Sequence, residues 1–220
     1  MPKQVAVIGL GRFGGAVARE LYQMGHDVLA IDRDERVTQD LVGQVTYAVA
    51  GNAISAEFLE EVGIKDVDAA VVAVGVDIQS SVLITVLLKQ RFHVKKVVAR
   101  ANDDLHGQAL QAVGADRVAY VEQEAGRRTA HSLFYEEVIE HMDLTPRFGF
   151  SKIVASSHLV GKSLEQAGFS GLRDKYGASV IAIKRGREPI LAPSKEEVIQ
   201  PGDVLVIAGW EEVLEKVRAG

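Results

Sequence analysis

The chain has 220 residues, a formal net charge of −5 and no cysteine. Its length allows one large domain or two small ones, and the absence of cysteine excludes disulfides, thiolate metal sites and cysteine nucleophiles. The charge is modest and no basic stripe is present, so we expect no nucleic-acid partner. No apolar run reaches the ~18 residues that suggest a membrane span. We therefore expect a cytoplasmic protein that acts at the inner face of a membrane only through a partner.

The first half of the chain alternates short β-branched runs with longer helical patterns. We expect strands over residues 5–9, 27–32, 45–50, 69–74, 95–100 and 117–121. Helices are expected between them, over residues 13–24, 55–62, 78–90 and 104–113. Strands that are apolar throughout and alternate with helices predict a parallel sheet covered on both faces. The fold class is thus α/β, with a Rossmann-like doubly wound domain over residues 1–122.

The second half has a different pattern. Residues 123–142 have helical periodicity and TPRFGF at 145–150 contains linker residues, so we expect a crossover helix and linker over 123–144. We expect three strands and two short helices after it, over residues 152–156, 179–185, 203–209, 163–168 and 210–218. This pattern predicts a small α+β C-terminal domain over residues 145–220.

The segment VAVIGLGRFGG at residues 5–15 holds a G-x-G-x-x-G pattern made by Gly9, Gly11 and Gly14. The pattern follows a predicted strand, opens a predicted helix, and is followed by Asp32 at the end of the second strand, which is the context of a dinucleotide-binding turn. Gly9 permits the tight turn, Gly11 lets the backbone approach a phosphate, and Gly14 lets helix and strand pack closely. We expect phosphates at the helix N-terminus and ribose hydroxyls at Asp32. The alternative is a tight turn without a ligand.

Arg12 brings a full positive charge to the start of this helix. A terminal γ-phosphate gains more from such a charge than a bridging pyrophosphate does, which favours ATP or ADP over NAD or NADH. The alternative is an arginine that only faces solvent. The Asp32 carboxylate would repel the 2′-phosphate of NADP, although the neighbouring Arg33 weakens this argument.

Small or polar residues also follow the later strands, and the carboxyl ends of parallel strands meet at one ligand-facing edge. Asn52 and Ala53 after the third strand could form an adenine pocket, or could simply end a loop. The full set of expected nucleotide contacts is Gly9, Gly11, Arg12, Phe13, Gly14, Asp32, Arg33, Asn52, Ala53, Gly75, Asp77, Gln79 and Arg100.

Signals of catalysis are weak. The six histidines are scattered, no G-x-S-x-G elbow occurs, and no G-x-x-x-x-G-K-[ST] loop occurs. We therefore expect a binding protein with no catalytic residues. An NAD-dependent oxidoreductase is the main alternative, and it would need a substrate domain with an acid–base pair. A nucleotide-sensing transcription factor would need a DNA-binding segment, and the chain has no segment to spare for it.

Six segments occur in an order that resembles one family: VAVIGLGRFGG, DVLAID, AGNA, VVAVGVDIQSSVLITVLLK, GADRV with VEQE, and PGDVLVIAG. Together they resemble the cytosolic regulatory subunits of Trk/Ktr-type potassium uptake systems, also called RCK domains. The resemblance runs from about residue 4 to 217 and rests on the combination of motifs. It implies a potassium-transport regulator that binds ATP/ADP or NAD/NADH. It also implies a homodimer that assembles into an octameric gating ring under a membrane-embedded potassium-translocating subunit.

The resemblance also implies roles for single residues. Arg12 would lie near the terminal phosphate, Arg100 matches a basic position at the nucleotide site, and Glu122 matches an acid that can hold Mg²⁺ or another divalent cation between subunits. The second half resembles a domain that binds cyclic di-AMP in some relatives, and its alternative is an ordinary dimerisation domain. The residues expected at that second-messenger site are Arg173, Ile181, Ile183 and Pro193.

Overall fold

The computed structural model describes residues 2–133, 138–145, 148–169, 178–210 and 212. The chain divides into two compact units, Met1–Gln123 and Glu124–Gly220, and each is described by itself.

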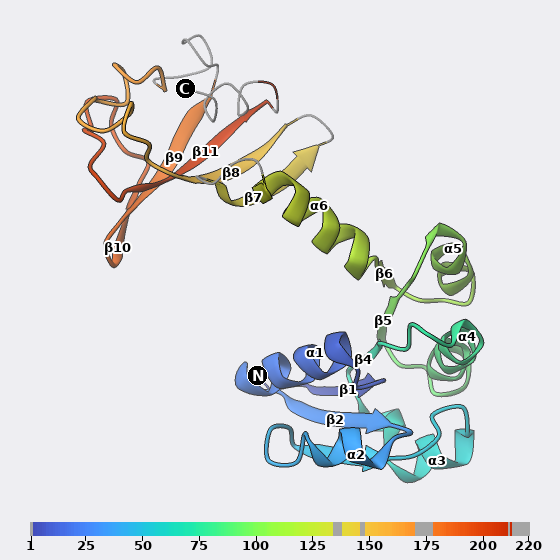
Figure 1. Cartoon of the computed structure of the whole chain (residues 1–220). Coiled ribbons are helices and arrows are strands. Elements are labelled where there is room, and N and C mark those ends of the chain that lie inside the picture. Colours follow the sequence, from blue (N-terminus) through green and yellow to red (C-terminus); the bar gives the residue numbers. More distant parts are fainter. Residues whose placement is uncertain (1, 134–137, 146–147, 170–177, 211, 213–220) are drawn as a thin grey trace. The chain divides into compact units, whose positions relative to one another are not determined.

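The first unit is a six-stranded parallel sheet with the strand order β3-β2-β1-β4-β5-β6 (Figure 1). Its strands are β1 (Gln4–Ile8), β2 (Asp27–Asp32), β3 (Tyr47–Ala50), β4 (Ala69–Val72), β5 (Lys96–Arg100) and β6 (Arg117–Ala119). Its helical elements are α1 (Arg12–Gln23), α2 (Glu35–Gln39), α3 (Ala56–Glu61), the 3-10 turn η1 (Ile64–Asp66), α4 (Ile78–Val86), its π-helical continuation η2 (Leu87–Arg91) and α5 (Asp104–Ala112). Helix α6 (Val121–Leu133) begins at the end of this unit.

Both faces of this sheet are buried, because neighbouring residues of each strand point to opposite faces and nearly all are apolar. On one face, Val7 and Val28 are fully buried in a cluster with Ala18 of α1. On the other face, Ile8 and Ile31 are buried in a cluster with residues of α3, α4 and α5. The doubly wound α/β fold predicted from the sequence is thus confirmed.

The helix starts of the first unit differ in how they are capped. Asp34, Ser55, Asp77 and Asp103 precede α2, α3, α4 and α5, and each accepts a backbone N–H from the first turn of its helix. Helix α1 begins after Gly11 and has no side-chain cap. Its first N–H groups therefore have no intrahelical partner and none from a capping side chain.

The second unit holds a five-stranded antiparallel sheet with the order β10-β9-β11-β8-β7. Its strands are β7 (Val138–Thr145), β8 (Phe148–Val154), β9 (Ser179–Arg185), β10 (Glu188–Leu191) and β11 (Val204–Trp210). One face of the sheet packs on a core that includes Ile153, Ile183, Leu205 and Ile207, together with Leu159 and Leu164 from the chain after β8.

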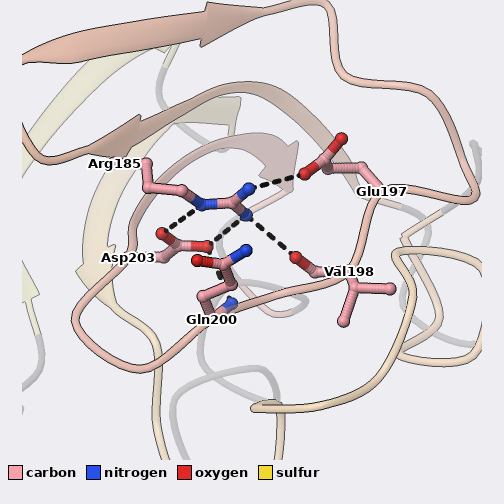
Figure 2. A network of polar contacts seen from close by, with 5 residues as sticks. All are labelled: Arg185, Glu197, Val198, Gln200 and Asp203. Carbon is pink, nitrogen blue, oxygen red and sulfur yellow. Dashed lines mark hydrogen bonds and ion pairs between the residues drawn. The ribbon is translucent and has the colours of Figure 1, made fainter.

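A polar network ties β9 of this unit to the turn before β11 (Figure 2). The Arg185 guanidinium donates from Nε and Nη2 to the two carboxylate oxygens of Asp203, at 3.0 and 2.8 Å. It also donates to Glu197 Oε1 at 2.8 Å and to the Val198 carbonyl oxygen at 2.9 Å. The carboxylate of Asp203 accepts a further bond from the backbone N–H of Gln200 at 2.8 Å. Only 1% of the Asp203 side chain is exposed.

The prediction of one helix over residues 123–142 is wrong. Helix α6 ends at Leu133, and Val138–Thr145 forms β7, which pairs with β8. The sequence VIEHMDLT satisfies both periodicities, because Met142 and Leu144 alternate with polar residues while Val138 and Met142 also have helical spacing. The expected linker at 145–150 is corrected in the same way, since Thr145 ends β7 and Phe148 begins β8.

Two shorter expectations also need correction. Residues 163–168 form turns and no helix, although Ser163 and Gln166 exchange the reciprocal hydrogen bonds of a helix start. The turn stops at Gly168, whose φ of +85° does not continue a helix. In the expected helix over 210–218, Trp210 is instead the last residue of β11, and residues 211 and 213–220 lie outside the described residues.

Candidate functional site

The turn between β1 and α1 requires glycine at two positions. Gly9 has a φ of +89°, a left-handed conformation that side chains rarely adopt, and its N–H donates to the Ile31 carbonyl oxygen at 2.8 Å. A Cβ at Gly14 would lie 1.8 Å from the carbonyl oxygen of Gly9 and 2.9 Å from the Cβ of Ala73. The turn therefore depends on close contact between the backbone of the loop, the first turn of α1 and the end of β4.

The start of α1 is open, in contrast to the crowded Gly14. No atom lies within 4 Å of the position that a Cβ at Gly11 would take. Arg12 is exposed, and within the described ranges its side chain has no hydrogen bond or ion pair. Phe13 is half-buried beside it. An uncapped helix N-terminus with a free cation and open space above it can bind an anion.

Asp32 is fixed beside this turn. Its Oδ2 accepts from the backbone N–H of Leu10 at 2.6 Å, and its Oδ1 accepts from the backbone N–H of Asp34 at 2.9 Å. A carboxylate offers about four lone-pair sites, so about two remain for hydroxyl groups of a ligand. The hydrogen bond to Leu10 also couples the orientation of this carboxylate to the glycine turn.

The strand order places this turn at the point where the topology reverses. The chain adds β2 and β3 on one side of β1 and then returns to add β4, β5 and β6 on its other side. In open α/β sheets, ligands bind outside the carboxyl ends of the strands at such a reversal. The expected contacts after β2, β3, β4 and β5 share this edge with the glycine turn.

The contacts expected after β3 differ in exposure. Asn52 is exposed, and its Oδ1 accepts from the backbone N–H of Ile54 at 3.1 Å, which fixes the side chain in an Asx turn. Ala53 is 6% exposed and belongs to the core under α3, so its methyl group offers little surface to a ligand.

After β4, Asp77 caps α4 and accepts from the backbone N–H and the hydroxyl of Ser80, at 3.0 and 2.5 Å. The side-chain hydrogen bond from Ser80 contributes most to lowering the pKa of Asp77, followed by the backbone bond from Ser80, and the charge of Arg33 adds to it. Arg33 follows β2, so this interaction spans the end of β1, which lies between β2 and β4. Gln79 is exposed in the first turn of α4.

Arg100 and Glu122, which were expected to have separate roles, form an ion pair. The Arg100 side chain is 22% exposed and that of Glu122 is 61% exposed. The guanidinium of Arg100 also packs on Gly75, where a Cβ would lie 2.6 Å from Nη1. Nε of Arg100 is buried with no hydrogen-bond partner among the described residues. The loop after β4 is thus in direct contact with the ion pair that reaches the first turn of α6.

Replacing Gly75 by alanine tests this contact. We expect a loss of about 1 kcal/mol in the free energy of unfolding, at the low end for overpacking, because the guanidinium lies at the end of a flexible side chain and can shift away from the new methyl group. In an Arg100→Ala background the same change should be close to neutral. Urea unfolding of the four proteins of this double-mutant cycle measures the coupling. Equal losses in both backgrounds would show that Arg100 does not make the contact.

Two residues of this edge were missed by the sequence analysis, Asn102 and His106. The Asn102 side-chain amide donates to the Gly75 carbonyl oxygen, and its backbone N–H donates to His106 Nδ1 at 3.3 Å. His106 is 2% exposed, and burial lowers its pKa while the charge of Asp103 opposes the shift. The polar run NDD at 102–104, directly after a strand, was the available signal.

The residues expected at a second-messenger site differ in their exposure to solvent. The backbone N–H of Ala192 donates to the Ile181 carbonyl oxygen at 3.0 Å, which brings the segment before Pro193 beside β9. Ile181 is 42% exposed, whereas Ile183 is fully buried in the core. The register between β9 and β11 shifts at Ile181, so these two isoleucines do not share a face. Arg173 lies outside the described residues.

In the part of the chain that the structure describes, no three histidine, aspartate or glutamate side chains are grouped so that they could hold a metal ion. Among the described helices, none combines the length and the apolar character needed to cross a bilayer.

Residues 5–121 match the model of the TrkA-N domain, and residues 151–219 match that of the TrkA-C domain. Ktr system potassium uptake protein C of Bacillus subtilis (strain 168) is 35% identical over 209 residues, which cover 95% of this chain and 93% of that protein. Ktr system potassium uptake protein A of the same organism is 36% identical over 214 residues, with coverages of 97% and 95%. Among solved structures, the GsuK channel bound to NAD has a TM-score of 0.65 at 16% identity. It covers 99% of this chain and 39% of that chain, and the likeness shows the fold.

Proposed function

The chain belongs to the family of potassium uptake proteins built from a TrkA-N and a TrkA-C domain, and on this premise we propose that it is the nucleotide-sensing regulatory subunit of a Trk/Ktr-type potassium uptake system. The observation that carries the nucleotide-sensing part is the open start of α1. There an uncapped helix N-terminus, the exposed Arg12, which has no side-chain partner among the described residues, and the carboxylate of Asp32 lie around the same turn. Phosphate and ribose are the groups that such donors and acceptors bind.

The ligand that fits best is ATP, exchanged for ADP, and NAD/NADH is the alternative. Arg12 supplies an exposed charge for a terminal phosphate, while the backbone of the turn binds the inner phosphates. Asp32 binds the ribose, and Asn52, exposed after β3 at the same edge of the sheet, is assigned to the adenine. Two nucleotide states regulate a protein only when they differ in their contacts, and Arg12 provides such a difference.

Arg12→Ala tests this assignment. We expect ATP affinity to fall about tenfold or more, as for the loss of a charge-assisted hydrogen bond of about 1.5–3 kcal/mol, while ADP affinity changes less. Arg117→Ala is the matched control. Arg117 is exposed at the beginning of β6, so this change removes the same charge at the amino-terminal edge of the sheet, away from the glycine turn. Calorimetric titration of both variants with ATP and ADP gives the comparison. If the ratio of ATP affinity to ADP affinity is the same in Arg12→Ala as in the unmodified protein, Arg12 is not the sensor.

The remaining assignments form one assembly. Residues 1–122 bind the nucleotide, α6 crosses over, and the second unit from β7 onward forms the RCK C-terminal domain, which takes cyclic di-AMP at the segment of Ile181 and Pro193. Glu122 leaves its ion pair with Arg100 when it binds Mg²⁺ between subunits. Homodimers assemble into an octameric ring at the cytoplasmic face of a membrane-embedded potassium-translocating subunit.

The functional test is potassium flux through a Ktr-type membrane subunit in vesicles. We expect that adding this protein makes the flux depend on whether ATP or ADP is present. A flux that is the same with either nucleotide would contradict the proposal. The alternative of an NAD-dependent oxidoreductase has no support among the two relatives, both of which are potassium uptake proteins.

A further inference from the structure

A cavity of about 740 Å³ lies at the opposite edge of the first unit's sheet, where β1, β2 and β3 begin. Ligand pockets typically measure roughly 300–1,000 Å³, so its size is sufficient for a side chain with its flanking groups. None of the residues proposed to bind the nucleotide lines it. It is therefore separate from the nucleotide site.

The floor of the cavity is apolar, and it is left uncovered because helix α3 is short. Leu29 of β2 and Val49 of β3 lie on the sheet face that α3 covers, and both line the cavity. Helix α3 has six residues, and the chain turns away at Gly63, which has a φ of +77°. The amino-terminal part of this sheet face is left partly open, and Tyr47, paired with Leu29, is 67% exposed at its rim.

The polar part of the lining carries charge of one sign. The acidic residues Asp27, Glu61 and Asp66, all exposed, are among those that line the cavity, and none of its lining residues is a lysine, arginine or histidine. Over the described ranges, none of the three carboxylates forms an ion pair. Like charges around a partly apolar pocket repel one another, so a bound cation would lower their energy.

We propose that this cavity receives a lysine or arginine side chain from a cytoplasmic segment of the membrane-embedded partner. This identification rests on the proposed function. Cytoplasmic segments next to membrane spans are enriched in lysine and arginine. Such side chains combine an apolar stem with a charged head, which matches an apolar floor under a carboxylate rim. The exposed ring of Tyr47 adds an aromatic surface suited to a cation. The partner thus docks at the edge of the sheet that is remote from the nucleotide.

A basic peptide and a matched pair of double variants test this docking site. The probe is acetyl-Leu-Arg-Leu-Arg-Leu-amide, and the acidic peptide acetyl-Leu-Glu-Leu-Glu-Leu-amide is its control. Glu61→Gln with Asp66→Asn removes two charges from the cavity. Glu20→Gln with Glu35→Gln removes two exposed charges from α1 and α2, outside the cavity. We expect the cavity variant to bind the basic peptide at least tenfold more weakly than the unmodified full chain, and the control variant within twofold.

Absence of peptide binding to the unmodified chain would overturn the proposal, and so would equal losses in both variants. Analytical ultracentrifugation of the same samples tests whether a second copy of this chain occupies the cavity. A change of oligomeric mass in the cavity variant alone would assign the cavity to a second copy of this chain and overturn docking of the partner. Titration with ATP and ADP on these samples tests the proposed function independently, because the nucleotide site lies at the other edge.

Discussion

Gly14→Ala is expected to abolish nucleotide binding by disrupting the turn that forms the site. The new Cβ would lie 1.8 Å from the Gly9 carbonyl oxygen, and Gly9 cannot move freely because its N–H is bonded to Ile31. Overpacking usually costs about 1–3 kcal/mol and occasionally more, and here the obstacle is backbone, so we expect about 3 kcal/mol or more. Urea unfolding measures the loss of stability, and calorimetry with ATP measures the loss of binding.

Gly11→Ala is the matched control within the same turn. Its Cβ would meet no atom within 4 Å, and the φ of −61° at Gly11 is ordinary for alanine. We expect the free energy of unfolding to change by no more than about 0.5 kcal/mol. The affinity for ATP should still fall at least tenfold, because the methyl group occupies the space through which phosphates approach the helix start. If this variant binds ATP normally, the phosphates do not lie at Gly11. If Gly14→Ala is as stable as the unmodified chain, the contact with Gly9 is not as described.

The sequence was sufficient for the parts of the fold that depend on local patterns. The parallel sheet follows from apolar strands that alternate with helices, and the glycine turn follows from residues that are adjacent in the chain. It was not sufficient for β7, because VIEHMDLT satisfies both the helical and the strand period. Pairing with β8 decided between them, and that pairing is a tertiary contact.

In the candidate site, too, the features set by local sequence were predicted, and those set by tertiary contacts were not. The glycines and Asp32 are in the positions that their motif predicts, because the turn is local and the acid ends the adjacent strand. The ion pair of Arg100 with Glu122 was not foreseen, because it depends on how β5 is placed beside β6. The burial of Ile183 beside the exposed Ile181 was also hidden, since a register shift in the sheet reverses the face on which one residue lies.

Arg185→Met is expected to destabilise the second unit strongly. It leaves the Asp203 carboxylate 1% exposed and without the guanidinium that binds both of its oxygens (Figure 2). Removing one partner of a buried pair costs about 3–5 kcal/mol, because the other charge stays buried. Lys195→Met is the control, since its pair with Glu165 is 56% exposed on both sides and such pairs contribute at most about 1 kcal/mol. Urea unfolding of the full chain, followed by the fluorescence of Trp210, measures both changes.

The pH dependence separates a lost ion pair from a simple loss of packing. Burial raises the pKa of Asp203, but the hydrogen bonds and charge of Arg185 and the N–H of Gln200 outweigh it and hold the pKa below its ordinary value. A depressed folded-state pKa contributes stability at neutral pH that is lost as the pH falls below about 4. In Arg185→Met the pKa of Asp203 should rise instead, so acidification should narrow the stability gap between the variant and the unmodified protein.

The double variant Arg185→Met with Asp203→Leu completes the test. Because it removes both charges and fills their space with apolar groups, we expect it to recover most of the stability that the single change loses. If the double variant is as unstable as Arg185→Met alone, the loss of stability does not come from the unpaired Asp203 carboxylate. It then comes from the other hydrogen bonds of Arg185, to Glu197 and to the Val198 carbonyl oxygen. A stability gap that stays constant as the pH falls from 7 to about 3 would lead to the same conclusion.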